Sequence, residues 1–447
     1  MGRLNYEHAA AVPYGEQAMR LDRVRAVLAA LGDPHQSLRL VHIAGTKGKG
    51  STGAMIAAAL RSAGRSVGFT TSPHLDRLEE RFAVDGAPCD AAELVALVDR
   101  VRPVAERLDR EMGEGPTFFD LTTAMALRHF ADRGVDAAVV EVGLGGRLDS
   151  TNVVTPAVSV VTSISLDHTR QLGPTRGLIA AEKAGILKPG VPAVSGVADA
   201  DAGDVIERIA EERGCPLLRR GRDFDIQPSG DGWRFTIERT SRSRTVLDDV
   251  RPALPGAAQA ANAAVALATL DALDRAEWEI PVAARVSGVA RGRLPARMER
   301  FEGDPMIVID GAHNDASAAA LAEVMDALLP DTPRERRLLV AAISDDKDPA
   351  AILEPLARRF SGVVVTRYVD NPRASDPERL AIVARRSFAA EAVRTADDPA
   401  GAFAAAKRWA AEVGPNTAIG FTGSLLFAAE ARRLVAEERG DSLGVPW

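Results

Sequence analysis

The sequence predicts an α/β protein with two domains, each built on a mostly parallel sheet, and three observations predict this fold class. Apolar runs of strand length alternate with amphipathic or Ala-rich stretches of helical length, as in a parallel sheet with helices on both faces. The chain has 447 residues, which is too many for one hydrophobic core. The alternation restarts after residues 288–300, whose Arg, Gly and Pro content is typical of a linker.

The first domain is organised around residues 39–58, RLVHIAGTKGKGSTGAMIAA. The apolar run at 40–44 predicts a buried strand, and the Ala-rich stretch that begins at Ser51 predicts a helix with a hydroxyl at its start. Three glycines between them permit a tight turn and a close approach to a ligand: Gly45, Gly48 and Gly50. The N–H groups of a helix start, the helix dipole and Lys49 together favour a bound anion.

This stretch is close to the strand–GxxxxGK[ST]–helix pattern of a phosphate-binding loop. It departs from that pattern because Gly50 follows Lys49, which delays the hydroxyl residue to Ser51. The alternative interpretation is a glycine-rich turn with a solvated lysine.

The other elements of the first domain follow from the same alternation. Strands are predicted at 66–70, 136–142, 157–164 and 191–195, with an antiparallel hairpin within 221–249. Helices are predicted at 16–31, 91–108, 120–133, 176–186 and 257–274. The loop GLGGRLDSTN lacks GxGxxG spacing and no long helix follows it at once, which argues against a dinucleotide-binding fingerprint.

The second, smaller α/β domain repeats the pattern without an internal repeat of sequence. Its strands are predicted at 306–310, 337–343, 363–367 and 418–421. Its helices are predicted at 315–328, 349–359, 376–388, 399–412 and 424–437.

Composition excludes several classes of protein. The net charge of −7 argues against a broad nucleic-acid-binding surface, so an anionic ligand must be held by a local patch. No run of 18 apolar residues and no apolar signal core at the N-terminus occur, which predicts no membrane segment and favours the cytoplasm. The two cysteines, Cys89 and Cys215, are too few for a disulfide framework or a zinc site.

Three polar residues stand at or just past the ends of predicted strands: Ser72, Glu141 and His168. Because parallel strands present their carboxyl ends at one edge, these side chains should meet beside the phosphate loop. Near a bound triphosphate they predict divalent cation sites, since Mg²⁺ takes few protein ligands plus phosphate oxygens. Imidazole is an unusual magnesium ligand. Taken singly, each residue could equally be structural, as a satisfied carboxylate, a helix cap or a helix-start residue.

The second domain offers a comparable loop. Residues 310–314, DGAHN, follow a predicted strand directly and bring a carboxylate, an imidazole and an amide to a helix start. An ordinary turn with Asp or Asn capping the helix is the alternative. Arg297, in the predicted linker, could reach bound phosphates.

At this point the chain resembles a known family, the Mur ligase superfamily, and within it the folylpolyglutamate synthase/dihydrofolate synthase group. The resemblance rests on a series of segments in the family's order that spans residues 42 to 426: HIAGTKGKGST, TSPHL, TFFD, EVGLGGRLDSTN, TSISLDHT, EKAGILKPG, the helix with Gln259 and Asn262, RLPARME, DGAHN, DDKD and FTGSLL.

The resemblance implies a P-loop ATPase-like domain at 1–294 that binds ATP, and a smaller Rossmann-like glutamate-ligase domain at 295–447. It implies an ATP-dependent ligase of folate and one-carbon metabolism. A folate or dihydropteroate carboxylate is phosphorylated by ATP to an acyl phosphate, and the amino group of L-glutamate displaces phosphate. Two Mg²⁺ ions, and room for a monovalent cation, belong to the same expectation, as does a monomeric enzyme.

The resemblance also assigns roles residue by residue. ATP would be bound by Gly45, Thr46, Lys47, Gly48, Lys49, Gly50, Ser51, Asn262, Arg297, Asp310 and His313. Metal would be bound by Ser72, Glu141, His168 and a carbamate on Lys183. Lys49, His168 and Lys183 would act in catalysis. The substrates would be met by Thr117, Asp149, Ser150 and Thr151 in the pterin region and by Ser424 near glutamate.

Three departures from the family pattern leave the substrate preference open: Lys47, where many members have Asn; Asp120, where Glu is usual; and Ala296, where Gly is usual. Two alternatives also stay open. One is a Mur-type ligase acting on a different carboxylate, although cell-wall members usually carry a further N-terminal domain for which the phosphate loop at Gly45 leaves no room. The other is an ATP-gated interaction protein that uses closure as a switch.

Overall fold

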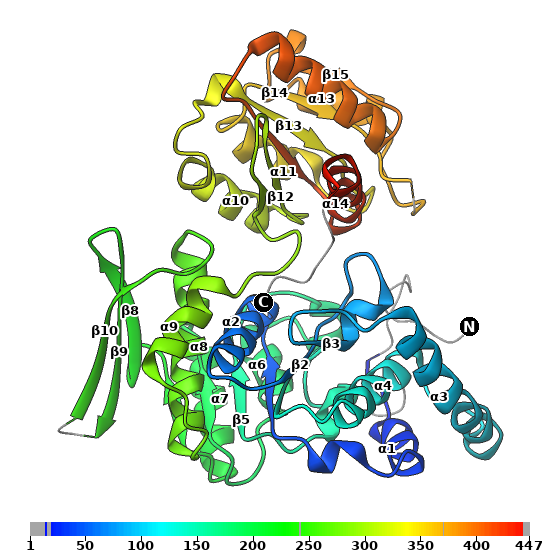
Figure 1. Ribbon diagram of the computed structural model, residues 1–447, viewed down its shortest axis with the longest axis vertical. Coiled ribbons are helices and arrows are strands. Elements are labelled where there is room, and N and C mark those ends of the chain that lie inside the picture. Colours follow the sequence, from blue (N-terminus) through cyan, green and yellow to red (C-terminus); the bar gives the residue numbers. More distant parts are fainter. Residues whose placement is uncertain (1–13, 16–18, 241–242, 370, 441–447) are drawn as a thin grey trace. The chain divides into compact units, whose positions relative to one another are not determined.

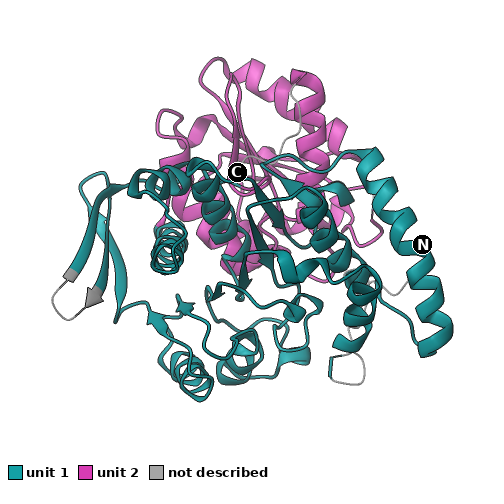
Figure 2. Cartoon of the chain, turned by 60° about the horizontal axis from the view of Figure 1, so that its bottom comes forward, with its two compact units in different colours: residues 1–253, 257–293, 445–447 teal, residues 254–256, 294–444 magenta. Residues whose placement is uncertain are grey.

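The computed structural model describes residues 14–15, 19–240, 243–369 and 371–440 (Figure 1). The chain divides into two compact units, and each is described by itself (Figure 2). Unit 1 takes the described residues up to 253 together with 257–293. Unit 2 takes residues 254–256 and the described residues of 294–444.

Unit 1 is built on a seven-stranded sheet with the strand order β3-β2-β4-β1-β5-β6-β7. Its strands are β1 (Leu40–Ala44), β2 (Val67–Thr70), β3 (Ala83–Val84), β4 (Ala137–Glu141), β5 (Val158–Val161), β6 (Ala193–Ser195) and β7 (Leu217–Arg219). Every neighbouring pair is parallel except β2 and β3. The central strands β1, β4 and β5 are buried along their whole length, as expected for a parallel sheet covered on both faces.

The helices of unit 1 surround this sheet (Figure 1). They are α1 (Leu21–Ala30), α2 (Lys49–Ser62), α3 (Ala91–Met112), α4 (Phe118–Asp132), α5 (Thr169–Leu172), α6 (Arg176–Ala184), α7 (Ala200–Glu212), α8 (Ala257–Arg275) and α9 (Val282–Arg291). The predicted helix at 16–31 corresponds to α1, and its residues 16–18 lie outside the described residues.

Helix α9 corrects the predicted linker at 288–300, because residues 288–291 complete this helix. Gly288 is not a turn residue there. A Cβ at Gly288 would lie 2.4 Å from the backbone of Ala59, so this glycine allows α9 to pack closely against α2.

The predicted hairpin is part of a three-stranded antiparallel sheet, with the order β10-β9-β8. Its strands are β8 (Phe224–Ser229), β9 (Gly232–Thr240) and β10 (Ser243–Val250). Phe224 and Phe235 are buried, and burial of one face favours a single register of these strands.

Unit 2 has a six-stranded sheet with the order β11-β12-β16-β13-β14-β15. Its strands are β11 (Glu299–Phe301), β12 (Met306–Ile309), β13 (Arg337–Ala341), β14 (Gly362–Val365), β15 (Val393–Thr395) and β16 (Ala418–Thr422). Its helices are α10 (Asp315–Leu328), α11 (Pro349–Ala357), α12 (Pro377–Ala384), α13 (Pro399–Val413) and α14 (Leu425–Arg439). The α/β fold with mostly parallel sheets is therefore confirmed in both units.

Strand order brings the predicted site residues of unit 1 to one edge of its sheet. β2, β4, β1 and β5 are consecutive and parallel, so their carboxyl ends lie side by side. Glu141 ends β4, Ser72 follows β2, and the phosphate loop follows β1. Within the part of the chain that the structure describes, no helix is long and apolar enough to cross a membrane.

Candidate active site

The loop between β1 and α2 has a backbone shape that requires glycine at two positions. Gly45 has a φ of 153° and Gly48 a φ of 83°, which side chains disfavour. A Cβ at Gly45 would lie 1.9 Å from Thr162 Oγ1, and a Cβ at Gly48 would lie 2.2 Å from Asn262 Oδ1. Asn262, which α8 carries, therefore lies against the phosphate loop.

Hydrogen bonds tie this loop to the segment that follows β5. Thr46 N donates to Ser163 O at 2.8 Å, and Lys47 N donates to Ser163 Oγ at 3.0 Å. Thr162 Oγ1 donates to Lys47 O at 2.7 Å, and Ser165 N donates to Thr46 Oγ1 at 3.1 Å. The loop is thus preorganised by the neighbouring strand, while the Lys47 residue itself is exposed.

Helix α2 begins at Lys49 without a side-chain cap, because its N-cap residue is Gly48. The first N–H groups of a helix have no partner within the helix. The N-cap residue Gly48 supplies none, so the amides around Gly50 and Ser51 face the carboxyl edge of the sheet with the positive end of the helix dipole. This is the geometry in which proteins bind phosphate.

Two lysines converge on the carbonyl oxygen of Gly45. Lys183 Nζ, from α6, donates to it at 2.9 Å, and Lys49 Nζ donates to it at 3.3 Å. Lys49 Nζ also lies 3.8 Å from Glu141 Oε1. Lys183 is only 5% exposed, and burial, followed by the nearby positive charge of Lys49, lowers the pKa of Lys183 to about 7. A substantial share of this amine is therefore neutral near pH 7.

Hard oxygen ligands are available beside the lysines. Glu141 is 8% exposed at the end of β4, and Ser72 follows the neighbouring strand β2. The Oγ atom of Ser72 is buried and lacks a hydrogen-bond partner among the described residues, which is costly unless another ligand satisfies it. Within the described part of the chain, no group of three or more His, Cys, Asp or Glu side chains is placed to hold a metal ion.

His168 differs from the other predicted metal ligands. It is the residue that starts the short helix α5, with a φ of 49°, so the helix-start role considered for it is real. Its side chain is 56% exposed and lies 3.9 Å from Asp167. Unlike Glu141 and Lys183, its imidazole is not held in a buried position.

The predicted pterin-region residues form two buried hydrogen-bond groups. In the first, Asp120 accepts hydrogen bonds from Thr117 N at 2.9 Å and from Thr117 Oγ1 at 2.8 Å. Ser150 Oγ donates to the other carboxylate oxygen of Asp120 at 2.7 Å. Thr117 also caps α4. Asp120, noted in the sequence only as a departure from the family pattern, is thus the centre of this group.

In the second group, Asp149 accepts hydrogen bonds from Leu144 N at 2.8 Å and Thr151 N at 3.0 Å. Thr151 Oγ1 lies 2.5 Å from Asp149 Oδ1 and 2.8 Å from His42 Nε2. Burial raises the pKa of Asp149 and lowers the pKa of His42 to about 3. His42 was not among the predicted site residues, because a lone histidine in a buried strand has no pattern that reveals its partner.

Unit 2 holds a separate group at the carboxyl edge of its own sheet. Asp310, just past β12, accepts hydrogen bonds from Met298 N and Ala312 N, both at 2.8 Å. Burial raises the pKa of Asp310, and the positive charge of Arg297 opposes that rise. His313 Nδ1 lies 2.8 Å from Gly311 O. Arg297, Asp310 and His313 therefore belong to one neighbourhood of unit 2.

Helix caps explain two further residues of unit 2. Asn314 caps α10, since its side chain accepts a hydrogen bond from Ser317 N at 2.9 Å, so the capping alternative considered for this loop is real. Ser424 caps α14, since its Oγ accepts a hydrogen bond from Leu426 N at 3.2 Å. Ser424 follows β16, the strand beside β12, and so lies at the same sheet edge as Asp310.

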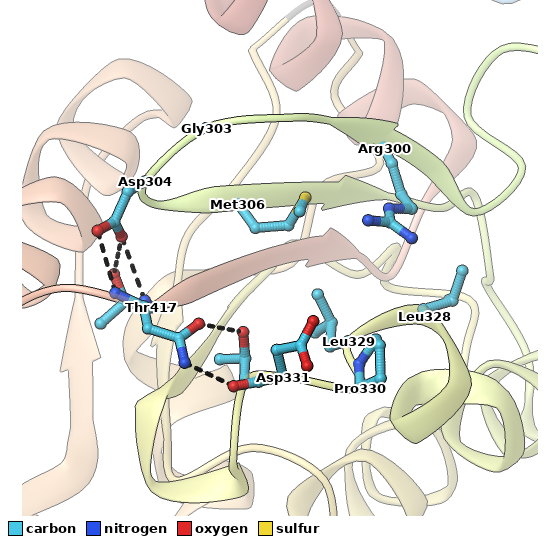
Figure 3. A pocket seen from close by; sticks show the side chains of 11 residues that line it. Arg300, Gly303, Asp304, Met306, Leu328, Leu329, Pro330, Asp331 and Thr417 are labelled. Atoms are coloured by element: carbon cyan, nitrogen blue, oxygen red, sulfur yellow. Dashed lines mark hydrogen bonds between the residues drawn. The ribbon is translucent and has the colours of Figure 1, made fainter.

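A cavity of about 330 Å³ in unit 2 lies apart from this edge (Figure 3). Its lining includes Met306, the first residue of β12, and Thr417, which precedes β16. These residues mark the amino ends of the strands, opposite Asp310. Asp304 accepts hydrogen bonds from Asn416 N at 3.0 Å and Thr417 N at 3.2 Å. These bonds connect the segment before β12 to the segment before β16.

Comparison with known proteins agrees with this arrangement. Residues 43–270 match the family model "Mur ligase middle domain", and residues 296–425 match "Mur ligase, glutamate ligase domain". The fold and the site thus define a Mur-type, ATP-dependent ligase.

Relatives in other organisms identify the family within the Mur-type ligases. The chain is 35% identical over 445 residues to the dihydrofolate synthase/folylpolyglutamate synthase of Mycobacterium tuberculosis, covering 94% of this chain and 90% of the relative. It is 38% identical over 357 residues to the folylpolyglutamate synthase of Lacticaseibacillus casei, covering 79% and 82%. The chain belongs to the folylpolyglutamate synthase/dihydrofolate synthase family.

Solved structures of this family have the same fold. Mycobacterium tuberculosis folylpolyglutamate synthase complexed with ADP superimposes with a TM-score of 0.79 at 35% identity, covering 93% of this chain and 94% of that one. E. coli FolC in complex with DHPP and ADP superimposes with a TM-score of 0.80 at 31% identity, covering 97% and 95%.

Proposed function

We propose that this enzyme uses ATP to activate the carboxylate of a folate or of dihydropteroate and joins it to the amino group of L-glutamate. The observation that carries the proposal is the uncapped start of α2, with Lys49 and Lys183 gathered beside it. ADP in the M. tuberculosis and E. coli structures, and DHPP in the latter, support the choice of nucleotide and of acceptor.

The proposed reaction has two steps. A carboxylate oxygen of the acceptor attacks the γ-phosphorus of ATP, and ADP leaves. The glutamate amine then attacks the carbonyl carbon of the acyl phosphate, and phosphate leaves as the nitrogen loses a proton. Lys49 and the amides of α2 are placed to offset the charge that develops on the phosphoryl oxygens.

Magnesium fits the ligands at the sheet edge. Ser72 offers a buried hydroxyl oxygen that has no hydrogen-bond partner in the described part of the chain, and Glu141 offers a buried carboxylate. Both are hard donors of the kind Mg²⁺ prefers. We propose Ser72 and Glu141 for one ion, and Glu141, His168 and a carbamate on Lys183 for a second. Bound Mg²⁺ supplies charge neutralisation of the triphosphate. A monovalent cation remains a further proposal.

The lysine carbamate has a physical basis in the structure. The neutral amine of Lys183 attacks the carbon of CO₂ and loses a proton, which leaves an anionic oxygen ligand. The depressed pKa of Lys183 makes the neutral amine available at neutral pH. The carbamate would also replace a repulsive contact with Lys49 by an attractive one.

The remaining assignments are proposals on the same footing. Residues 1–294 would form the ATP-binding domain and 295–447 the glutamate-ligase domain, acting as a monomer. Arg297, Asp310 and His313 would contact ATP from unit 2. Thr117, Asp149, Ser150 and Thr151 would line the pterin region, with the Asp120 and Asp149 hydrogen bonds shaping its wall, and Ser424 would lie near glutamate.

The test measures phosphate release by the purified protein with ATP, Mg²⁺ and L-glutamate, with dihydropteroate or tetrahydrofolate as acceptor, and identifies products by mass spectrometry. We expect phosphate release to need both acceptor and glutamate, and the acceptor to gain the mass of one glutamate residue. Phosphate release in the absence of both acceptor and glutamate would contradict the proposal and favour an ATP-gated interaction protein. Product formation only with an unrelated carboxylate would favour another Mur-type ligase.

A further inference from the structure

A cluster at the end of α6 surrounds the residue that precedes Lys183. Lys183 and Glu182 are consecutive in the last turn of this helix, and side chains of consecutive helical residues point about 100° apart. Lys183 Nζ reaches Gly45 O at 2.9 Å, whereas the Glu182 side chain points to other partners. Any rotation of this turn that moves Glu182 also moves Lys183.

The loop after β4 packs directly on this turn. Arg147 N donates to Glu182 O at 2.8 Å. A Cβ at Gly146 would lie 2.8 Å from Glu182 O and 3.0 Å from Lys183 Cα. A Cβ at Gly185 would lie 2.6 Å from Arg147 Cα. Two glycines thus allow two backbones to touch, and the position of Lys183 is fixed by the loop as well as by its own helix.

The Glu182 side chain is held from two directions. Arg147 Nε and Nη2 both donate to Glu182 Oε1, at 3.1 and 3.0 Å. Tyr14 OH donates to the other oxygen, Glu182 Oε2, at 2.6 Å. The Glu182 side chain is 17% exposed and the Arg147 side chain is 41% exposed, so solvent partly screens this ion pair. The geometry holds Glu182, because Arg147 donates twice to one carboxylate oxygen and Tyr14 donates to the other.

We propose that Arg147 and Tyr14 are positioning residues that act through Glu182 to hold the last turn of α6, and hence the Lys183 amine, at the phosphate loop. This inference rests on the proposed carbamate on Lys183. It adds that the carbamate forms efficiently only when the contacts of Arg147 and Tyr14 with Glu182 are intact. Substitution of groups that orient a metal ligand typically lowers activity or metal affinity by 10–100-fold.

The experiment compares Arg147→Ala and Tyr14→Phe with Arg176→Ala. Arg176 is a matched control because it is the first residue of the same helix, at the opposite end from Glu182, and pairs with Asp199 at 2.7 Å. Ligase activity is measured against bicarbonate concentration at fixed pH. The carbamate is detected independently by carbon-13 NMR of the protein equilibrated with ¹³C-bicarbonate, and folding is checked by thermal unfolding.

We expect Arg147→Ala to lower kcat roughly tenfold at ambient CO₂, to weaken the NMR signal, and to recover activity as bicarbonate is raised. Tyr14→Phe should show the same shift to a smaller extent, and because it removes one hydroxyl it serves where Arg147→Ala does not fold. Arg176→Ala should behave as wild type in bicarbonate dependence and signal.

Two results would overturn the inference: folded Arg147→Ala and Tyr14→Phe with unchanged bicarbonate dependence and signal, or an equal shift in Arg176→Ala. Failure of the underlying proposal gives a different result. In that case wild type itself shows no carbamate signal and Lys183→Ala keeps its activity.

Discussion

Two strand–loop–helix junctions of this enzyme, β1 to α2 in unit 1 and β12 to α10 in unit 2, start their helices in opposite ways. Helix α2 begins after Gly48 with no side-chain cap. Helix α10 begins after Asn314, whose side chain and that of Ser317 satisfy each other's backbone N–H groups in a capping box. Both junctions lie at the carboxyl edge of a parallel sheet.

The difference teaches how a site can be distinguished from a well-made turn. At α2 the helix start is occupied by glycines, which cannot cap it with a side chain and so leave its first amides available to a ligand. Lys49 and Lys183 lie beside these amides. At α10 the capping box satisfies the amides of Asn314 and Ser317, and the functional candidates Asp310 and His313 precede the helix. An anion is therefore expected at α2 and not at the start of α10.

The largest expected effect is that of Lys183→Ala, which removes the proposed carbamate from the α2 junction. We expect nearly complete loss of ligase activity, partly restored by a short carboxylic acid such as acetate in the vacated space. Lys188→Ala is the matched control, because burial also lowers the pKa of Lys188, to about 8, but its Nζ donates to Asn152 O at 2.8 Å. Full activity of Lys183→Ala without added acid would refute the role.

Lys49→Ala should have the next largest effect. Losing one preorganised electrostatic stabiliser of this type raises the barrier by roughly 2.7–4 kcal/mol. We expect a corresponding fall in kcat at saturating ATP, with a normal circular dichroism spectrum. Near-normal turnover would mean that the cations of this junction do not act on phosphate.

The lowered pKa of Lys183 should make the stability of the protein depend on pH. Its folded pKa of about 7 is below the ordinary value of 10.5, so between these values the unfolded state binds the proton and the folded state does not. Stability should therefore rise with pH across this window through this group. In CO₂-free buffer, Lys183→Met should lose that part of the rise in the free energy of unfolding, measured with urea. An identical slope in both proteins would contradict the assigned burial effect.

The smallest effect is expected from Asn314→Ala at the capped junction. Losing an N-cap costs about 1 kcal/mol of stability, which urea unfolding can measure. ADP affinity should not change beyond error, because this helix start is not proposed to bind phosphate. A large loss of ADP affinity with unchanged stability would remove the contrast between the two junctions.

Most of the fold could be predicted because its helices are of helical length and amphipathic or Ala-rich, and its central strands are short, continuous apolar runs. The central strands β1, β2, β4 and β5 and all five helices of unit 2 follow from hydrophobic pattern. Short edge strands such as β3, β7, β11 and β15, with two or three residues each, carry too little pattern to be recognised. The end of helix α9 falls within the predicted linker at 288–300 because the Arg, Gly and Pro content of that stretch is typical of a linker, whereas Gly288 allows close packing against α2.

The site divides in a similar way. The phosphate loop, Glu141 and Asp310 follow from their places next to strands, since topology alone brings strand ends together. The burial of Lys183 could not be predicted from its helix, where a lysine ordinarily faces solvent. The hydrogen bonds of Asp120 with Ser150, and of His42 with Thr151, join residues distant in sequence and depend on tertiary packing that no local pattern encodes.

Calorimetric titration of ADP into wild type and Gly48→Ala tests the central claim most directly, namely that the uncapped start of α2 is the phosphate site. Gly48 has a φ of 83°, a backbone conformation that a side chain disfavours, and a Cβ there would lie 2.2 Å from Asn262 Oδ1. The substitution therefore strains the loop and displaces either the loop or the Asn262 side chain beside it. With Asn314→Ala as the matched variant of unit 2, we predict loss of ADP binding in folded Gly48→Ala and normal binding in Asn314→Ala. Wild-type ADP affinity in a folded Gly48→Ala protein would contradict the account.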